Sequence, residues 1–445
     1  MSFYKQSIRL INIVIHPAMM GFFYGHDYLS VAQLERIRAS LDALDEPETI
    51  EAYERAFSAT IGKGEAISYG AARMAFYCYL RELNIGPGDE VLLTGYTCSV
   101  MTNAVWRTGA TPTFADIARD TLGTSPSSVA TAITPRTRLV VAQHSYGIPC
   151  AIDEIAALCR KHNIPLLEDC ALSLGSSLDG KSVGEWGDAA IFSGDRSKPL
   201  NTLTGGMLYT NDHGLAARLR EKNRQLPDFE KAHQHRLHAR FEMKRKYLHP
   251  SLYGLGYFLG KLSGLRRKLA EKLSGKPNYV LLNGDFKPRL KPGSYPYPAK
   301  HPAFLAQLGI YELERWPDET TRRRELLSVY LAIANECGLA PYLPSAYTDP
   351  RRKIVPLRLA YSHPQAANIS RSLRGHLDLD WVWFPEPVSF APGGPASYGY
   401  VTGTCPVAEE TCRQIVNWPC VVPKESTDRV IELFRRTSHV QSLVG

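Results

Sequence analysis

Residues 138–171 read RLVVAQHSYGIPCAIDEIAALCRKHNIPLLEDCA, and this stretch decides the fold. Residues 138–147 predict a short buried strand, RLVVAQ, followed by a turn, and residues 164–171 predict a second buried strand. Residues 152–162 between them predict a helix. Strands that alternate with helices in this way indicate an α/β domain with a mainly parallel sheet that helices cover on both faces.

The same alternation extends on both sides of this stretch, from about residue 60 to residue 210. Helices are expected at 71–83 and 99–109, and strands at 90–95 and 111–117. After about residue 214 the chain becomes charged, then rich in Gly, Tyr and Leu, and then rich in proline. We therefore predict four regions: an N-terminal arm with helices (1–60), a large domain (61–215), a basic, partly amphipathic insertion or arm (216–302), and a linking helix with a small α+β C-terminal domain (303–445).

Composition places the chain among ordinary globular proteins. Its 445 residues are 44% hydrophobic and 22% charged, and this length favours two domains over one. The nine cysteines are an odd number and form no CxxC pair, which favours reduced thiols in a cytosol. No apolar run approaches a membrane span, residues 1–17 lack a signal-peptide cleavage site, and no ligand cluster indicates a metal. We expect a cytoplasmic protein without a metal.

The positive charge of the chain is concentrated in one segment. Between residues 216 and 272, 15 Lys or Arg stand against 5 Asp or Glu, whereas the whole chain carries only +8. No zinc-finger spacing, RNA-binding signature or basic zipper accompanies the charge, so we do not expect a nucleic-acid partner. Within 240–275, leucines at helical spacing beside a basic face are compatible with peripheral membrane contact. A solvated helix that packs its leucines on the domain is the alternative.

Polar residues follow several of the predicted strands. Asp169 ends the strand at 164–171, Ser193 and Lys198 follow the strand at 189–192, and His144 follows the first strand of the opening stretch. In open α/β sheets, ligands bind at the carboxyl ends of the strands. We expect these four side chains to border one crevice.

A glycine turn precedes the helix predicted at 71–83. Gly70, with the amides of Ala71 and Ala72, would present free N–H groups at the start of the helix, where the helix dipole favours an anion. This turn is a candidate phosphate site.

These pieces together resemble one known family. The matching text, over about residues 65–212, is SYGAARMAFYCYLRELNIGPGDEVLLTGYT, TPTFADI, ITPRTRLVVAQHSYG, RKHNIPLLEDCALSLG and GKSVGEWGDAAIFSGDRSKPLNTLTGGMLYTND. In order and spacing it resembles the DegT/StrS-type sugar aminotransferases, which are fold-type-I enzymes dependent on pyridoxal 5'-phosphate. The resemblance implies that residues 61–215 bind this cofactor and that two copies of the chain form a homodimer with shared active sites.

The resemblance also implies a role for each residue at the cofactor. Lys198 would hold the aldehyde as a Schiff base and later move the proton of the substrate carbon. Asp169 would keep the pyridine nitrogen protonated. Ser193 and the turn at Gly70, Ala71 and Ala72 would bind the phosphate.

The chain departs from the family pattern at several of these positions. Ala71 stands where a hydroxyl residue is usual, and Pro199 follows the lysine in place of an asparagine. Cys98 stands near the place of the ring-stacking aromatic, so Tyr96 is the candidate to stack instead. Leu172 replaces a Gln or His against the cofactor ring, and Gly293, Ser294, Tyr295 and Pro296 replace an N-x-R-M motif. His144, Tyr146 and Tyr295 are the candidates for contact with the substrate.

Three functions are compatible with these residues. The first is transfer of an amino group from an amino-acid donor, expected to be glutamate, to a ketone, expected to be a nucleotide-linked keto sugar of polysaccharide or glycoconjugate biosynthesis. The second is a pyridoxal-phosphate enzyme that acts on a non-sugar or lipid-linked acceptor, which the altered motif at 293–296 and the basic segment favour. The third is a cofactor-binding regulator without turnover, although a protein that only binds has no need of both Lys198 and Asp169.

Overall fold

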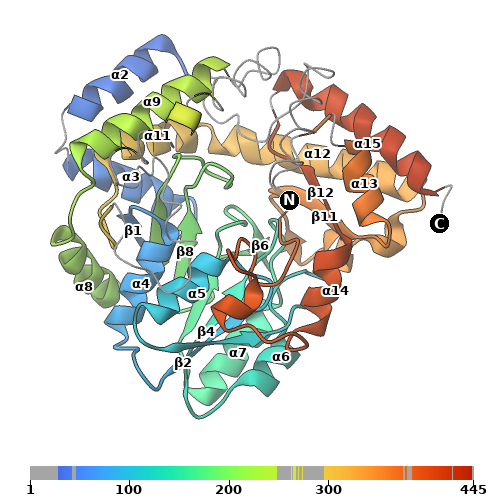
Figure 1. Ribbon diagram of the computed structural model, residues 1–445, viewed down its shortest axis with the longest axis horizontal. Coiled ribbons are helices and arrows are strands. Elements are labelled where there is room, and N and C mark those ends of the chain that lie inside the picture. The colour runs from blue at the N-terminus through green and yellow to red at the C-terminus, as the bar shows by residue number, and fades with distance from the viewer. Residues whose placement is uncertain are drawn as a thin grey trace.

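The computed structural model describes residues 29–42, 47–247, 295–373, 376–377, 383–422 and 424–442, together with residues 262, 264–266, 269 and 273. A seven-stranded sheet organises the larger part of the molecule (Figure 1), in the order β1-β9-β8-β5-β4-β2-β3. Six of its strands are parallel, and β9 alone runs antiparallel to both of its neighbours. The strands are β1 Glu65–Tyr69, β2 Glu90–Thr94, β3 Thr111–Ala115, β4 Thr137–Gln143, β5 Leu166–Asp169, β8 Ala189–Ser193 and β9 Gly206–Thr210.

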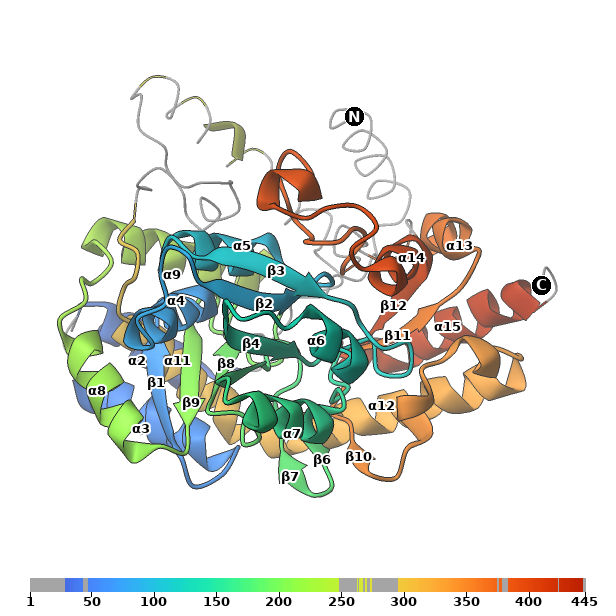
Figure 2. The same cartoon turned by 90° about the horizontal axis from the view of Figure 1, so that it is seen from below.

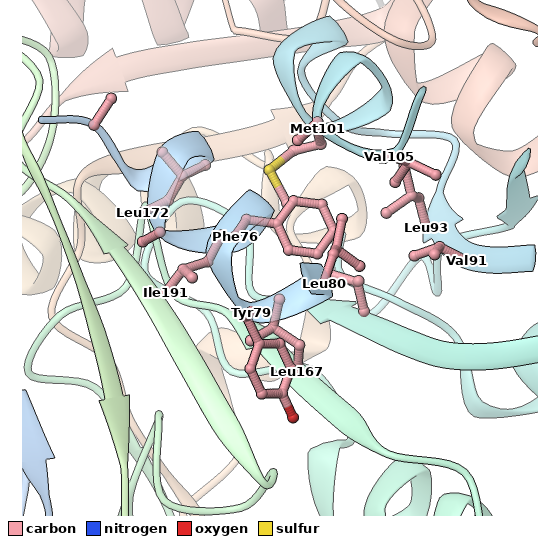
Figure 3. Close-up of a cluster of buried hydrophobic side chains, with 14 of the residues drawn as sticks. Phe76, Tyr79, Leu80, Val91, Leu93, Met101, Val105, Leu167, Leu172 and Ile191 are labelled. Carbon is pink, nitrogen blue, oxygen red and sulfur yellow. The ribbon is translucent and has the colours of Figure 1, made fainter. Parts of the chain in front are cut away.

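Helices cover both faces of this sheet, as Figure 2 shows. Alternation along β2 explains the arrangement, because Val91 and Leu93 face the core with α4 and α5 while Leu92 faces the core with α7. Figure 3 shows the first of these cores, in which Phe76 and Tyr79 of α4 lie close to Leu167 and Ile191 of the sheet. The helices of this region are α4 Ala72–Glu82, α5 Ser99–Trp106, α6 Pro126–Ala132, α7 Ile152–His162, α8 His213–Arg224 and α9 Lys231–Tyr247.

A second hydrophobic core lies beyond the large sheet. The antiparallel pair β11 (Arg358–Ser362) and β12 (Ile415–Pro419) lies beside the long helix α12 and the C-terminal helix α15, at the end of the molecule away from α8 (Figure 1). Tyr330, Trp418 and Phe434 are fully buried there, with ring centroids 4.7 Å and 4.9 Å apart for the two pairs that include Phe434. The remaining elements are α2 Val31–Asp42, α3 Pro47–Ala59, α11 Ala303–Glu314, α12 Trp316–Glu336, α13 Ala366–Ser372, α14 Pro406–Gln414, α15 Thr427–Ser442, β6 Ser177–Leu178, β7 Lys181–Ser182 and β10 Arg352–Lys353.

The single helix predicted from residue 303 is two helices in the structure. α11 ends at Glu314 and α12 begins at Trp316, with Pro317 in its first turn. Proline has no N–H to give to a continuing helix but is tolerated in the first turn, so it favours a new start here. α11 is buried on almost every side and packs against α2 and α3.

Parts of the sequence-based prediction lie outside the described residues. They include residues 1–28 of the N-terminal arm, most of the amphipathic stretch at 240–275, and positions 293 and 294 of the altered motif. The region boundaries at 60, 215 and 302 stay predictions. In the part of the chain that the structure describes, no helix has the length and apolar character needed to cross a membrane.

Candidate active site

A cleft lies at the carboxyl ends of β5 and β8, and its empty space is about 940 Å³ when the open solvent at its mouth is included. The starts of α4 and α5, the loop that carries Lys198, and three aromatic residues of the segment 383–390 form its other walls. The cleft therefore joins residues that lie far apart in the sequence.

Lys198 projects into this cleft from the loop after β8. Its backbone N–H donates to the Asp195 carbonyl at 2.9 Å, and the carbonyl of Pro199 accepts a hydrogen bond of 2.9 Å from the buried guanidinium of Arg323. The Nζ atom lies 4.1 Å from the centre of the Trp383 ring. Burial lowers the pKa of Lys198, while the nearby groups of Cys98 and Asp169 oppose this shift. More of its amine is neutral, and so nucleophilic, than in an exposed lysine.

Asp169 ends β5 on the same wall and is 6% exposed. One carboxylate oxygen accepts a hydrogen bond of 3.0 Å from the Ala171 amide. Burial raises the pKa of Asp169, and the Ala171 N–H and the charge of Lys198 only partly offset that effect. The carboxylate is therefore suited to a cationic partner in the cleft.

The glycine turn lies at the edge of the same cleft, where Ala72 and Arg73 open α4 and form part of the wall. A Cβ on Gly206 would lie only 2.1 Å from the Ala72 nitrogen, so this glycine permits β9 to approach the turn closely. The Gly70 amide donates to the Ala299 carbonyl at 2.9 Å, which holds the turn from its other side. Ser193 lines the cleft beside it, whereas Ala71 caps α4 without a side-chain hydrogen bond.

The aromatic residue expected at the cofactor ring is not supplied by Tyr96. Its side chain is fully buried outside the cleft walls, where its hydroxyl lies 2.8 Å from that of Tyr146. Cys98 and Leu172 do line the cleft, as the sequence suggested for the cofactor site. The aromatic surface of the cleft comes instead from Trp383, Phe384 and Phe390.

The three substrate candidates lie outside the cleft walls. His144 is fully buried and pairs with Glu168 at 3.1 Å, while its Nδ1 accepts from the Cys150 amide, so its proton is on Nε2. Tyr146 is fully buried behind the cleft, and Tyr295 packs against His233 with ring centroids 6.2 Å apart. Their assignment to the substrate stays a prediction.

The side chains of His144, Glu168 and Cys170 lie close enough together to hold a metal ion. The carboxylate of Glu168, however, already accepts hydrogen bonds from the amides of Gly184, Trp186 and Gly187 at 2.7–2.8 Å. A buried carboxylate that is satisfied in this way supports the backbone around Asp169. We interpret the cluster as structural.

Sequence reasoning missed Arg73, Gln143 and the aromatic residues 383–390, all of which line the cleft. Arg73 adjoins the predicted phosphate turn, and Gln143 ends a predicted strand, so position alone could have indicated both. The aromatic text WVWFPEP at 381–387 is conspicuous in composition, but no strand or helix pattern ties it to Lys198.

Comparison with known proteins identifies the family. Residues 29–257 match the model of the DegT/DnrJ/EryC1/StrS aminotransferase family, and the chain belongs to this family. The match confirms the family predicted from the sequence, and the solved structures that resemble the chain confirm its fold class.

Individual known proteins also resemble this chain in sequence or in structure. The spore coat polysaccharide biosynthesis protein SpsC of Bacillus subtilis is 34% identical over 199 residues, which is 44% of this chain and 51% of that protein. The UDP-N-acetyl-3-dehydro-alpha-D-glucosamine 3-aminotransferase of Acidithiobacillus ferrooxidans is 37% identical over 160 residues, 36% of this chain and 43% of the relative. The crystal structure of S. venezuelae DesV in complex with a ketimine intermediate superposes with a TM-score of 0.64 at 25% identity, over 92% of this chain and 96% of DesV. The chain spans about half the length of the curated relatives it matches.

Proposed function

We propose that this protein is a pyridoxal-phosphate-dependent aminotransferase that transfers an amino group from an amino-acid donor, expected to be glutamate, to the ketone of a nucleotide-linked sugar. The observation that carries the proposal is the position of Lys198 and Asp169 in one cleft beside the start of α4. The name of the Acidithiobacillus relative, which specifies a UDP-linked dehydro sugar, supports this class of acceptor. A place in polysaccharide biosynthesis is supported by the name of SpsC.

The cleft fits the cofactor on three chemical grounds. Asp169 offers a buried carboxylate to a protonated ring nitrogen. The start of α4 and the hydroxyl of Ser193 offer donors to a phosphate. Lys198 offers an amine of lowered pKa to an aldehyde. When bound, the cofactor supplies the aldehyde and the conjugated ring that accepts electrons from the substrate.

The residues of the cleft have separate proposed roles in the reaction. Lys198 would hold the aldehyde and, once the donor amine has replaced it there, would take and return the proton of the reacting carbon at Nζ. Asp169 would hold the ring nitrogen in its protonated form. The aromatic side chains of Trp383, Phe384 and Phe390 limit the access of water to these groups.

Replacement of the lysine tests this function. Purified protein with pyridoxal phosphate is treated with glutamate and with glutamine separately, and the visible absorption of the bound cofactor is followed before nucleotide-linked keto sugars are supplied. Lys198→Ala is expected to abolish turnover with every acceptor. Lys181→Ala, at an exposed lysine near Trp186, serves as the matched control. Full turnover by Lys198→Ala would exclude the proposal.

Two results of the same experiment would favour the alternative functions. An intact cofactor spectrum with no reaction toward any amino donor would indicate a regulator. A complete reaction with the donor, followed by failure with every nucleotide-linked sugar, would indicate a non-sugar or lipid-linked acceptor.

We also propose that the chain acts as a cytoplasmic homodimer with sites shared between two copies. Support comes from the family membership, and from the placement of His144, Tyr146 and Tyr295, none of which lines the cleft in the described part of the chain. Sedimentation at micromolar concentration tests the stoichiometry. If each site uses residues of both copies, two inactive variants can complement each other. Lys198→Ala chains, mixed with inactive chains altered at a residue that the partner copy contributes to the site, are then expected to regain part of the activity.

Peripheral membrane contact through residues 240–275 is proposed on a separate observation. Leu262, Leu265, Leu269 and Leu273 are 45–84% exposed and follow one another at helical spacing, while the sequence between them is rich in Lys and Arg. The full chain is expected to float with anionic vesicles and not with neutral ones. If the Leu265→Ser, Leu269→Ser double variant floats with anionic vesicles as well as the unaltered chain does, these leucines do not mediate membrane contact and the proposal fails.

A further inference from the structure

A short segment near the C-terminal end, residues 383–390, forms one wall of the cleft in a strained conformation. Phe384, Val388 and Phe390 have φ angles of +57°, +46° and +61°, a region that bulky residues rarely occupy. Strain of this kind persists only where the surroundings impose it, and it clusters at binding and catalytic sites.

Hydrogen bonds to the loop before α5 hold this segment in place. The Val388 amide donates to the Gly95 carbonyl at 2.9 Å, and the Ser389 amide donates to the Thr97 carbonyl at 2.7 Å. The Ser99 amide returns a hydrogen bond of 3.0 Å to the Ser389 carbonyl. The segment is therefore docked beside Cys98, the position where the family pattern places an aromatic ring.

This docking puts Trp383 directly opposite the lysine. The indole is 4% exposed, and its ring centre lies 4.1 Å from Nζ of Lys198 and 5.6 Å from Cζ of Arg358. Its backbone is fixed at both ends, because its N–H donates to Oδ1 of Asn417 at 3.2 Å and its carbonyl accepts from the Tyr146 hydroxyl at 3.1 Å. Tyr146 therefore supports the backbone of Trp383 and does not itself line the cleft.

The indole N–H of Trp383 has no hydrogen-bond partner among the residues that the structure describes. A buried donor of this kind calls for a partner, because burial removes it from water. The indoles of Trp186 and Trp418 share this feature within the described part of the chain, but neither lines the cleft. A molecule bound in the cleft would lie against both Trp383 and Lys198.

We propose that Trp383 forms a subsite for the acceptor, in which its indole N–H donates to a hydroxyl oxygen on the sugar ring beside the reacting carbonyl. This inference rests on the proposed function. The groups that fit the cofactor, namely Asp169, Ser193 and the start of α4, belong to the strand ends and the glycine turn. Trp383 comes from the separate segment 383–390, and its backbone is hydrogen-bonded to Asn417 of β12. A pyranose offers apolar C–H faces and peripheral hydroxyls, which suit an aromatic wall with one donor at its edge.

Trp383→Phe tests the donor, because it keeps an aromatic ring and removes the N–H. We expect the KM for the nucleotide-linked keto sugar to rise about fivefold to twentyfold. The affinity for pyridoxal phosphate, measured by absorbance titration, and the reaction with the amino donor are expected to stay within about twofold of the unaltered protein. Trp383→Leu, which also removes the ring, is expected to raise this KM further.

Trp418→Phe is the matched control, since it removes a buried indole without a partner from the core of the small domain. It is expected to lower the melting temperature and to leave the KM for the sugar unchanged. An unchanged sugar KM in Trp383→Phe would overturn the inference. A loss of cofactor affinity in that variant, with the sugar KM unchanged, would assign the N–H to the cofactor and would overturn it as well.

A binding measurement separates this inference from the proposed function. If the unaltered protein transfers no amino group to any keto sugar, the proposed function fails. Binding of a nucleotide-linked sugar is then followed by quenching of tryptophan fluorescence, which is expected in the unaltered protein and in Trp418→Phe and is expected to be lost in Trp383→Phe. Equal quenching in all three proteins would show that Trp383 does not contact the sugar.

Discussion

Burial shifts the two central ionisable groups of the cleft toward their neutral forms. It raises the pKa of Asp169 and lowers that of Lys198, so that each group is easier to neutralise than its exposed counterpart. The shift at the lysine favours reaction with an aldehyde. The shift at the aspartate works against its proposed role, because an aspartate holds a protonated ring nitrogen only when it is charged.

This shift predicts a pH dependence of cofactor binding. A raised pKa means that Asp169 loses its charge at a higher pH than an exposed aspartate, so the affinity for pyridoxal phosphate is expected to fall as the pH drops through that pKa. The dissociation constant is measured by absorbance titration between pH 8 and pH 5. Asp169→Asn is expected to bind more weakly at pH 8 and to lack this part of the pH dependence. The same slope in both proteins would mean that other groups cause it.

The sequence predicted the residues of the cleft only where a strand pattern fixed them. Asp169, Ser193, Lys198 and Ala72 of the glycine turn follow strands of one sheet, and parallel strands end at one edge, so these four residues line one cleft. His144, expected at the same crevice, is instead buried beside Glu168 and does not line the cleft. Trp383 could not be found in this way, because its place depends on hydrogen bonds to Gly95 and Thr97 across a long stretch of chain. Tyr96 was misjudged for a related reason: Tyr146 provides a buried partner for its hydroxyl.

At the scale of elements, α12 holds the loop that carries Lys198. Arg323 on this helix is 3% exposed and donates to the carbonyl of Pro199, and Glu319 one turn earlier binds both Arg322 and Arg323. Pro199 has no N–H to anchor the loop, and its carbonyl is anchored instead by a guanidinium. The break between α11 and α12 sets the start of this helix, and sequence periodicity alone did not reveal it.

Glu319→Gln tests this support through its pH dependence. Burial opposes ionisation of Glu319, but Arg323 and Arg322 outweigh it and hold the carboxyl pKa below its usual value. A carboxyl group whose pKa is lower in the folded state than in the unfolded state stabilises the fold at pH values above its unfolded pKa, which is about 4.3 for glutamate. This contribution to stability is lost as the pH falls through the folded-state pKa. Glu319→Gln is expected to cost about 1–2 kcal/mol at pH 7 and progressively less below about pH 4.

Chemical denaturation at several pH values measures this difference. Glu336→Gln is the control, since it breaks an exposed pair with Arg435 and is expected to change the free energy of unfolding by less than about 0.5 kcal/mol. A difference for Glu319→Gln that stays constant between pH 7 and pH 3.5 would contradict the role of its charge.

At the scale of the whole molecule, the cleft lies in the first hydrophobic core and is tied to the second by hydrogen bonding. Trp383 packs in the same core as Leu172 and Ile191, and its backbone N–H donates to Asn417 of β12, beside the second core. The alternation of strands and helices predicted the parallel sheet. It could not predict that β9 runs antiparallel between β8 and β1, because the hydrophobic period is the same for either strand direction. Nor does that period show that residues 383–390 dock beside Cys98.

Because one wall of the cleft is hydrogen-bonded to β12 beside the second core, a bound cofactor is expected to stabilise the whole molecule. At 100 times its dissociation constant, a ligand that binds only the folded state adds about 2.7 kcal/mol, or about 3 °C in melting temperature for a chain of this size. Scanning calorimetry with pyridoxal phosphate is expected to shift a single unfolding transition by this amount, and pyridoxal without the phosphate at the same concentration is expected to shift it less. Two transitions, of which only one moves, would instead show that the cores unfold independently and that the contacts of Trp383 do not couple them.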